Sequence, residues 1–180
     1  MAQPQNLQQK MSERLKRDFY QSDVLDVAPG LLGNYLVRIY PDGKQERYMI
    51  TETEAYRGEE DKACHACRGK TRRTEVMFSE GGRLYMYFIY GMYWMMNIVA
   101  GAEGEPQAVL IRGLREVSGP GRLTRLLQLD RGFYGEDLVT SERIWLEASG
   151  NDPEYTTGPR IGIKYAGQPW IDMPWRFLMR

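Results

Sequence analysis

The sequence predicts an α+β fold with a largely antiparallel β-sheet. Short turns separate most of the strand-like segments, so hairpins outnumber alternating strand–helix–strand units. Alternating units would indicate a parallel sheet, whereas hairpins indicate an antiparallel one. The 180 residues show no internal repeat, low-complexity segment or linker. A chain of this length can bury the core of one domain. We therefore expect residues 1–180 to form a single domain.

The pattern along the chain predicts helices first, a series of strands in the middle and one further helix. Apolar residues at near-helical spacing predict the first helix, and Ser22-Asp23 caps the second. Pro41-Asp42-Gly43 and Tyr90-Gly91-Met92 are turns between paired strands, and Gly119-Pro120-Gly121 opens the last helix. In order, we expect helices over 6–20 and 22–27, strands over 35–40, 45–56, 84–89, 93–99 and 107–112 with an irregular segment over 57–74, a helix after 121, short strands over 143–147 and 160–165, and a closing segment over 175–179.

Composition excludes several classes of protein. Twenty-four basic residues balance twenty-four acidic ones, and 12% of the residues are aromatic, which excludes a block-charged disordered chain. Nucleic-acid binding through the charge of the whole molecule is also excluded, so any such function must rest on a local basic patch. Residues 1–10 lack the apolar core of a signal peptide, and the apolar run 84–100 is short and rich in tyrosine. We expect a soluble, cytoplasmic protein that does not bind membranes.

Two carboxylates are predicted to share one face of the strand over 45–56. Because side chains alternate along a strand, Glu52, Glu54 and Tyr56 lie on one side, with the two carboxylates roughly 6.5–7 Å apart. They could form an acid/base pair, or one could activate a water molecule. The alternative is the solvated face of an edge strand. Ile50 is expected on the same face, which argues against a fully solvated face.

Two features could bind phosphate. Residues 62–73 include basic side chains and no acidic one, so they could contact a DNA backbone or form an ordinary solvated loop. The start of the helix at Gly121 offers free amide groups, which could bind an anion or simply begin the helix. The candidates for backbone contacts are Arg68, Lys70, Arg72, Arg73 and Gly121.

Cys64 and Cys67 flank His65, the single histidine. A zinc site needs four ligands, and structural sites have two ligand pairs, whereas this segment has one pair of cysteines. A redox dithiol would lack its usual βαβ context. Two cysteines are also too few for a disulfide-stapled secreted scaffold. A lone histidine such as His65 is more often a packed or capping residue than a functional one, and a zinc or dithiol protein centred on Cys64 and Cys67 is a further alternative.

The segment 84–97 is unusually aromatic. Its strands could simply pack in the core. Tyr90, however, falls at the turn, where its own sheet cannot bury it, so it could act as a wedge between bases, with Tyr87 offering a ring for stacking. Asn97 lies in an apolar strand and needs a polar partner. Arg112 ends another apolar strand and pairs with a carboxylate or reaches a phosphate.

Taken together, three segments resemble the alkyladenine (3-methyladenine) DNA glycosylase family. They are 52–56 with Asp61 and His65, 84–97, and Gly119-Pro120-Gly121-x-Leu123. Weaker similarity covers 31–33, 160–162 and 175–177. The resemblance implies a curved sheet flanked by helices with a protruding hairpin, as in the C-terminal domain of formyltransferases. One departure is the short connection 113–118, where family members usually have a longer helical segment.

The resemblance also implies a function. It predicts a monofunctional glycosylase of base excision repair that flips an alkylated or deaminated purine nucleotide out of duplex DNA. Glu54 would activate the water that hydrolyses the N-glycosidic bond. The implied lesions are 3-methyladenine, 7-methylguanine, hypoxanthine and ethenoadenine. The expected partner is double-stranded DNA that contains damaged purines. The protein is expected to be a monomer and, if it comes from a bacterium, to associate with the nucleoid. Neither a metal nor an organic cofactor is expected.

The same resemblance assigns the other site residues. The implied roles are base stacking for Tyr56 and Tyr87, a hydrogen bond to the base edge for His65, insertion into the DNA for Tyr90, discrimination against the guanine amino group for Asn97, and contact with the flipped nucleotide's backbone for Arg112. A non-catalytic nucleic-acid-binding module that uses the same hairpin and basic loop is the alternative function.

Overall fold

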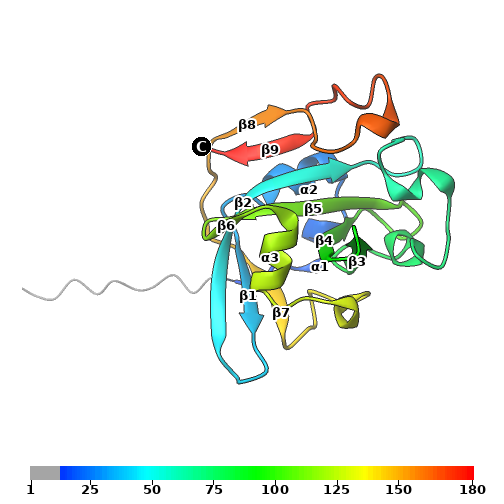
Figure 1. Cartoon of the computed structure of the whole chain (residues 1–180). Coiled ribbons are helices and arrows are strands. Elements are labelled where there is room, and N and C mark those ends of the chain that lie inside the picture. The colour runs from blue at the N-terminus through cyan, green and yellow to red at the C-terminus, as the bar shows by residue number, and fades with distance from the viewer. Residues whose placement is uncertain (1–12) are drawn as a thin grey trace, which may run out of the picture.

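The computed structural model of the protein describes residues 13–180, which fold around a curled β-sheet (Figure 1). Three helices accompany it in this range: α1 (Arg17–Tyr20), α2 (Val24–Gly30) and α3 (Pro120–Leu126). The strands are β1 (Tyr35–Ile39), β2 (Gln45–Tyr56), β3 (Leu84–Ile89), β4 (Tyr93–Ala100), β5 (Gln107–Leu114), β6 (Val117–Ser118), β7 (Ile144–Glu147), β8 (Tyr155–Gly158) and β9 (Arg176–Met179). Short 3-10 helices cover His65–Arg68, Glu75–Phe78, Arg131–Phe133 and Lys164–Ala166. The longest of the described helices have seven residues, too few to cross a membrane.

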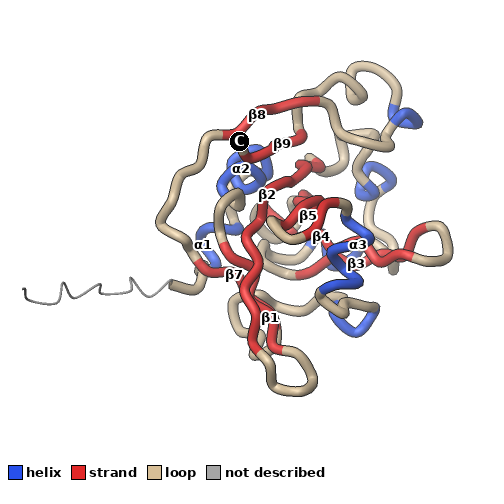
Figure 2. The backbone as a smooth tube through the Cα atoms, turned by 60° about the vertical axis from the view of Figure 1, so that its left-hand side comes forward, coloured by secondary structure: helices blue, strands red, loops and turns tan. Residues whose placement is uncertain are grey.

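The strand pairs are antiparallel, in the order β3-β4-β5-β2-β1-β7. The long strand β2 pairs with β1 through its first half and with both β5 and β9 through its second half. Figures 1 and 2 both show β8 and β9 along one edge of the sheet, beside β2. The predicted α+β class and the antiparallel sheet are therefore confirmed.

The N-terminal helices differ from the prediction. The helix expected over 6–20 begins outside the described residues, and within them only its last turn, α1, is helical. Residues 13–16 are not helical because they pair with β7. The amide of Leu15 donates to the carbonyl of Leu146, and Arg14 forms an isolated antiparallel β-bridge with Glu147. The second helix is capped by Asp23 as predicted, but it continues through Pro29 to Gly30.

A β-bulge in β2 changes which side chains share a face. The register of β2 against β5 shifts on both sides of Glu52. As a result Ile50 and Ala55 are packed in the same core, although residues five apart would point to opposite faces of a regular strand. The expectation that Ile50 shares the face of Glu54 and Tyr56 is wrong, because the extra residue reverses the alternation.

The main core lies on one side of the sheet, under α2 and α3. It is built from side chains that are almost entirely shielded from solvent, among them Leu31, Leu36, Ile50, Ile111 and Leu123. The hydroxyl of Thr53 donates to the carbonyl of Ala28 at 2.8 Å and so ties α2 to β2. The other side of β2 is left for the polar residues described below.

The predicted strand over 160–165 is wrong. Residues 159–163 form a loop that folds back toward β2, and the strand lies earlier, at β8. Pro159 has no amide to donate, Gly162 has a φ of +79°, and the amide of Ile161 donates to the Glu54 side chain instead of to a neighbouring strand. These three features end the extended conformation.

A buried ion pair fixes this loop to the segment that follows the C-terminal end of β2. Both side chains of Asp61 and Arg160 are fully buried, and they share two hydrogen bonds of 2.5 and 2.9 Å. Arg160 also donates to the carbonyl of Ala55 at 2.9 Å, while Asp61 accepts the amides of Arg57 and Ala63. The pair therefore joins the end of β2 and the segment that follows it to a loop 99 residues later in the chain.

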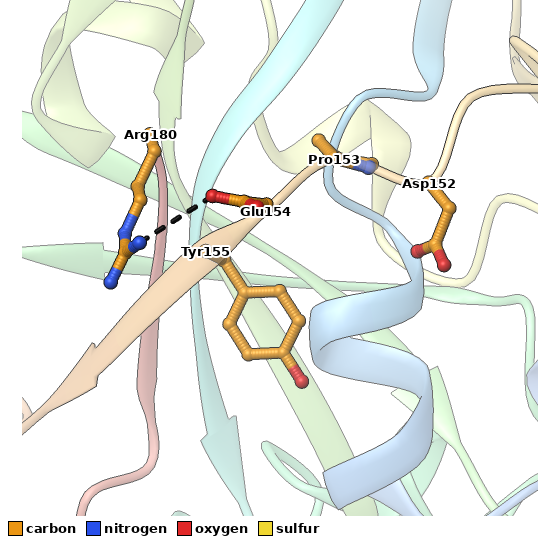
Figure 3. Close-up of a pocket in the computed structure, with 5 residues that line it drawn as sticks. All are labelled: Asp152, Pro153, Glu154, Tyr155 and Arg180. Atoms are coloured by element: carbon orange, nitrogen blue, oxygen red, sulfur yellow. Dashed lines mark hydrogen bonds and ion pairs between the residues drawn. The ribbon is translucent and has the colours of Figure 1, made fainter.

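We expect Asp61→Asn to lower the free energy of unfolding by about 3–5 kcal/mol, because the variant leaves the Arg160 charge buried without its counter-charge. Denaturant unfolding measures the effect. The matched control is Glu154→Gln, which affects an exposed pair with Arg180 at a surface groove (Figure 3) and should cost less than about 1 kcal/mol. Equal losses in the two variants would contradict the role of the buried pair.

Candidate active site

A second, smaller hydrophobic cluster lies against the sheet on the side away from α2. It contains Cys64, Ala66, Val76, Met77, Tyr85, Val99 and Ala108. Along β3, Leu84 and Met86 pack in the main core, whereas Tyr85 and Tyr87 belong to this cluster. Side chains therefore alternate between the two faces along β3.

A cavity of about 40 Å³ opens beside this cluster. Of the five residues predicted for the base pocket, Tyr56, His65, Tyr87 and Asn97 line the cavity, and Arg112 does not. The remaining lining residues are Ala63, Cys64, Met77, Tyr85, Ala108 and Tyr165. The structure thus brings together residues from β2, β3, β4, β5, the 63–66 segment and the 164–166 turn.

Glu54 is fully buried next to this cavity. One carboxylate oxygen accepts the hydroxyl of Tyr56 at 2.9 Å, and the other accepts the amide of Ile161 at 2.7 Å. The Nε of Arg112 lies 3.5 Å from that second oxygen. Burial raises the pKa of the Glu54 carboxyl, and Arg112 together with the two hydrogen bonds opposes the rise.

Glu54 is the end of a chain of four alternating charges. The Nε of Arg112 also lies 3.3 Å from Glu52, and the Nε of Arg176 lies 2.6 Å from the same Glu52 oxygen. We call Arg176, Glu52, Arg112 and Glu54 the charge chain. Of the two alternatives for Arg112, the structure shows the pairing with carboxylates, and a contact with a nucleotide backbone stays a prediction.

His65 is held as a neutral imidazole. Its Nδ1 lies 2.8 Å from the Tyr85 hydroxyl, and its ring packs edge-on against Tyr87 with centroids 4.6 Å apart. Burial, together with the charges of Arg73 and Arg68, lowers the pKa of His65 to about 4. At neutral pH one ring nitrogen therefore donates a hydrogen bond and the other accepts one.

Asn97 and the cysteines have simple surroundings. The side-chain amide of Asn97 donates to the carbonyl of Tyr85 at 3.2 Å, which is the polar partner that its place in an apolar strand required. Burial raises the pKa of the Cys64 thiol to about 12, so the thiol is protonated at neutral pH. Cys67 is half-buried beside the carbonyl of Lys62. Across residues 13–180, no three His, Cys, Asp or Glu side chains gather as a metal site.

Tyr90 stands at the tip of the β3–β4 hairpin, as predicted. Its side chain is 82% exposed, and its φ of +54° is unusual for a residue with a large side chain. Gly91 follows with a φ of +65°. Phe88 and Met92 are also exposed, so the tip presents an apolar surface. Non-glycine residues in this backbone region cluster at functional sites.

The basic residues near the cavity are all exposed: Arg68, Lys70, Arg72 and Arg73. Within the described part of the chain none of them makes an ion pair, and the Arg73 guanidinium lies 5.2 Å from the centre of the Tyr87 ring. Gly121 has a packing role, because a Cβ there would lie 2.6 Å from the ring of Tyr93. Contacts of these five residues with DNA stay predictions.

Four residues of the site had no predicted role. Arg160 lies over the Tyr56 ring, 4.8 Å from its centre, and the amide of Ile161 binds Glu54. Tyr165 lines the cavity, and Arg176 belongs to the charge chain. Arg160, Ile161 and Arg176 lie in the segments 160–162 and 175–177, whose weaker resemblance to the family was the only sequence signal for them. No sequence signal pointed to Tyr165.

Comparisons with known proteins agree with this site. The family model described as "Methylpurine-DNA glycosylase (MPG)" matches residues 18–118 and 115–180. The chain is 40% identical to a protein of Methanocella arvoryzae, over 91% of this chain and 90% of the relative. It is 41% identical to one of Legionella pneumophila, over 93% and 94%, and 42% identical to one of Anaeromyxobacter dehalogenans, over 93% and 84%. Each of the three is named "Putative 3-methyladenine DNA glycosylase". The chain belongs to the methylpurine-DNA glycosylase family.

Proposed function

We propose that the protein is a monofunctional DNA glycosylase that hydrolyses the N-glycosidic bond of an alkylated or deaminated purine flipped out of duplex DNA. Family membership supports a DNA glycosylase of base excision repair. The observation that carries the finer proposal is the position of Glu54, a fully buried carboxylate that accepts a hydrogen bond from Tyr56, one of the tyrosines that line the cavity. Its substrates are the purine lesions named above.

Glu54 acts as the general base. It takes a proton from a water molecule, whose oxygen bonds to C1′ of the sugar while the bond from C1′ to the purine nitrogen breaks and its electron pair leaves with the base. The transition state resembles an oxocarbenium ion, so the carboxylate also offsets positive charge. Tyr56 and the Ile161 amide hold the carboxylate in one orientation, which supplies part of the positioning that catalysis needs.

The cavity receives the base. The rings of Tyr56 and Tyr87 offer flat surfaces for stacking, and neutral His65 can donate a hydrogen bond to a base edge without adding charge. Asn97 would discriminate against the exocyclic amino group of guanine. None of the residues that line the cavity is a lysine, so we propose hydrolysis by water without strand cleavage.

The exposed surface around the cavity binds the duplex. Tyr90 inserts into the space that the flipped nucleotide leaves, which lowers the cost of holding that nucleotide outside the stack. The four basic residues of 68–73, Arg112 and the Gly121 amide contact the backbone. In this proposal a monomer recognises double-stranded DNA in the cytoplasm. Because the chain has a net charge of zero, the attraction to DNA comes from the local basic patch at 68–73.

The variant Glu54→Gln separates catalysis from binding. We expect the single-turnover rate of base release from lesion-containing duplexes to fall at least about a hundredfold, because the amide cannot accept the proton, while duplex affinity changes little. Glu103→Gln, an exposed glutamate in the β4–β5 loop, is the matched control and should keep the wild-type rate. A wild-type protein that binds duplex DNA but releases no base from any lesion would favour the non-catalytic binding module.

A second variant, Tyr90→Ala, tests the wedge. Base release from duplex DNA should fall more than release from single strands, because only the duplex has a base stack whose gap must be filled. Rates on the two substrates, measured side by side, give the ratio. Tyr155→Ala removes an exposed tyrosine of β8 and should leave the ratio unchanged. An equal loss on both substrates would mean that Tyr90 does not act by insertion.

A further inference from the structure

The cavity is too small for its proposed occupant. Its volume is about 40 Å³, whereas an engineered protein cavity that binds benzene has roughly 150 Å³. A purine has two fused rings and is larger than benzene. For the cavity to receive a damaged purine, at least one lining side chain has to move.

Tyr165 is the lining residue with the most freedom to move. Nine of the ten lining residues are buried or half-buried, and most lie on strands or in the packed 63–66 segment. Tyr165, in contrast, is 69% exposed and lies on the short turn Lys164–Ala166, outside the sheet. A side chain with so much exposed surface can change rotamer without opening the core.

The backbone of the Lys164–Ala166 turn is anchored by buried neighbours, whereas the Tyr165 side chain is held by one hydrogen bond. The flanking residues Ile163 and Ala166 are buried in a small cluster with Ala63. The Tyr165 hydroxyl donates to the carbonyl of Ala63 at 2.9 Å. Breaking a single hydrogen bond that water can replace costs little, so the ring can swing outward while the backbone of the turn stays in place.

We propose that Tyr165 is the gate of the base pocket and a specificity-determining residue. Its ring narrows the cavity in the free protein, turns outward when the base is admitted, and in that position limits the size of the purine that fits. The inference rests on the proposed function, since it assumes that the cavity receives a purine. Beyond the proposed function, it states that the size of the purine decides which lesions are accepted and that Tyr165 makes this selection.

The test compares a small and a large lesion. Single-turnover release of hypoxanthine and of ethenoadenine, which carries an additional fused ring, is measured in duplex DNA for the wild type, Tyr165→Ala and Tyr165→Phe. Tyr165→Ala should raise the ratio of ethenoadenine to hypoxanthine release by about tenfold, the effect of removing bulk from a pocket wall. Tyr165→Phe keeps the ring and loses the hydrogen bond to Ala63, so its ratio should equal that of the wild type.

The possible failures are distinguishable. If the wild type releases bases and Tyr165→Ala leaves the ratio unchanged, the gate is overturned while the proposed function stands. If Tyr165→Phe changes the ratio as much as Tyr165→Ala, the hydrogen bond rather than the ring sets the size limit, and the gate as proposed is wrong. If the wild type releases neither these two bases nor 3-methyladenine and 7-methylguanine, both proposals are overturned. Thermal unfolding of each variant confirms that it is folded, which is expected for a side chain this exposed.

Discussion

The architecture of the site depends on keeping a fully buried carboxylate charged. Burial raises the pKa of the Glu54 carboxyl and so favours its protonated form, and a protonated carboxyl could not take a proton from water. The compensation comes from Arg112, from the Ile161 amide and from the Tyr56 hydroxyl. Arg112 is in turn shared with Glu52, which Arg176 also binds. The ionisation of Glu54, the proposed general base, therefore depends on the whole charge chain.

The fold explains how the charge chain is assembled. β2 supplies both carboxylates, β5 supplies Arg112 and β9 supplies Arg176, and both β5 and β9 pair directly with β2. The bulge at Glu52 lets Glu54 and Tyr56 lie on the face opposite to the core that holds Ile50, and Tyr56 lines the cavity. The loop around Ile161, held by the buried pair of Asp61 and Arg160, completes the site from the far end of the chain.

The sequence predicted the features that follow from local patterns. Turn residues located both main hairpins, and alternation along a strand was enough to bring Glu54 and Tyr56 together. The position of Ile50 was mispredicted because a bulge depends on how two strands pair, which one strand does not reveal. The segment 160–165 alternates like a strand, but its amide at Ile161 is used by a side chain more than a hundred residues away. Tyr165 gave no signal, because its role arises from packing against a distant segment.

The charge chain is best tested through the pH dependence of base release. In the wild type, the rate should fall as Glu54 is protonated, with a midpoint above the ordinary glutamate value of 4.5, because burial raises the pKa of Glu54. Glu52→Gln removes a negative charge that raises this pKa and leaves Arg112 to Glu54 alone, while the amide oxygen can still accept from Arg176. The midpoint should therefore move to lower pH, with the rate at neutral pH nearly retained. An unchanged midpoint, or one moved to higher pH, would show that the charge chain does not set the ionisation of Glu54.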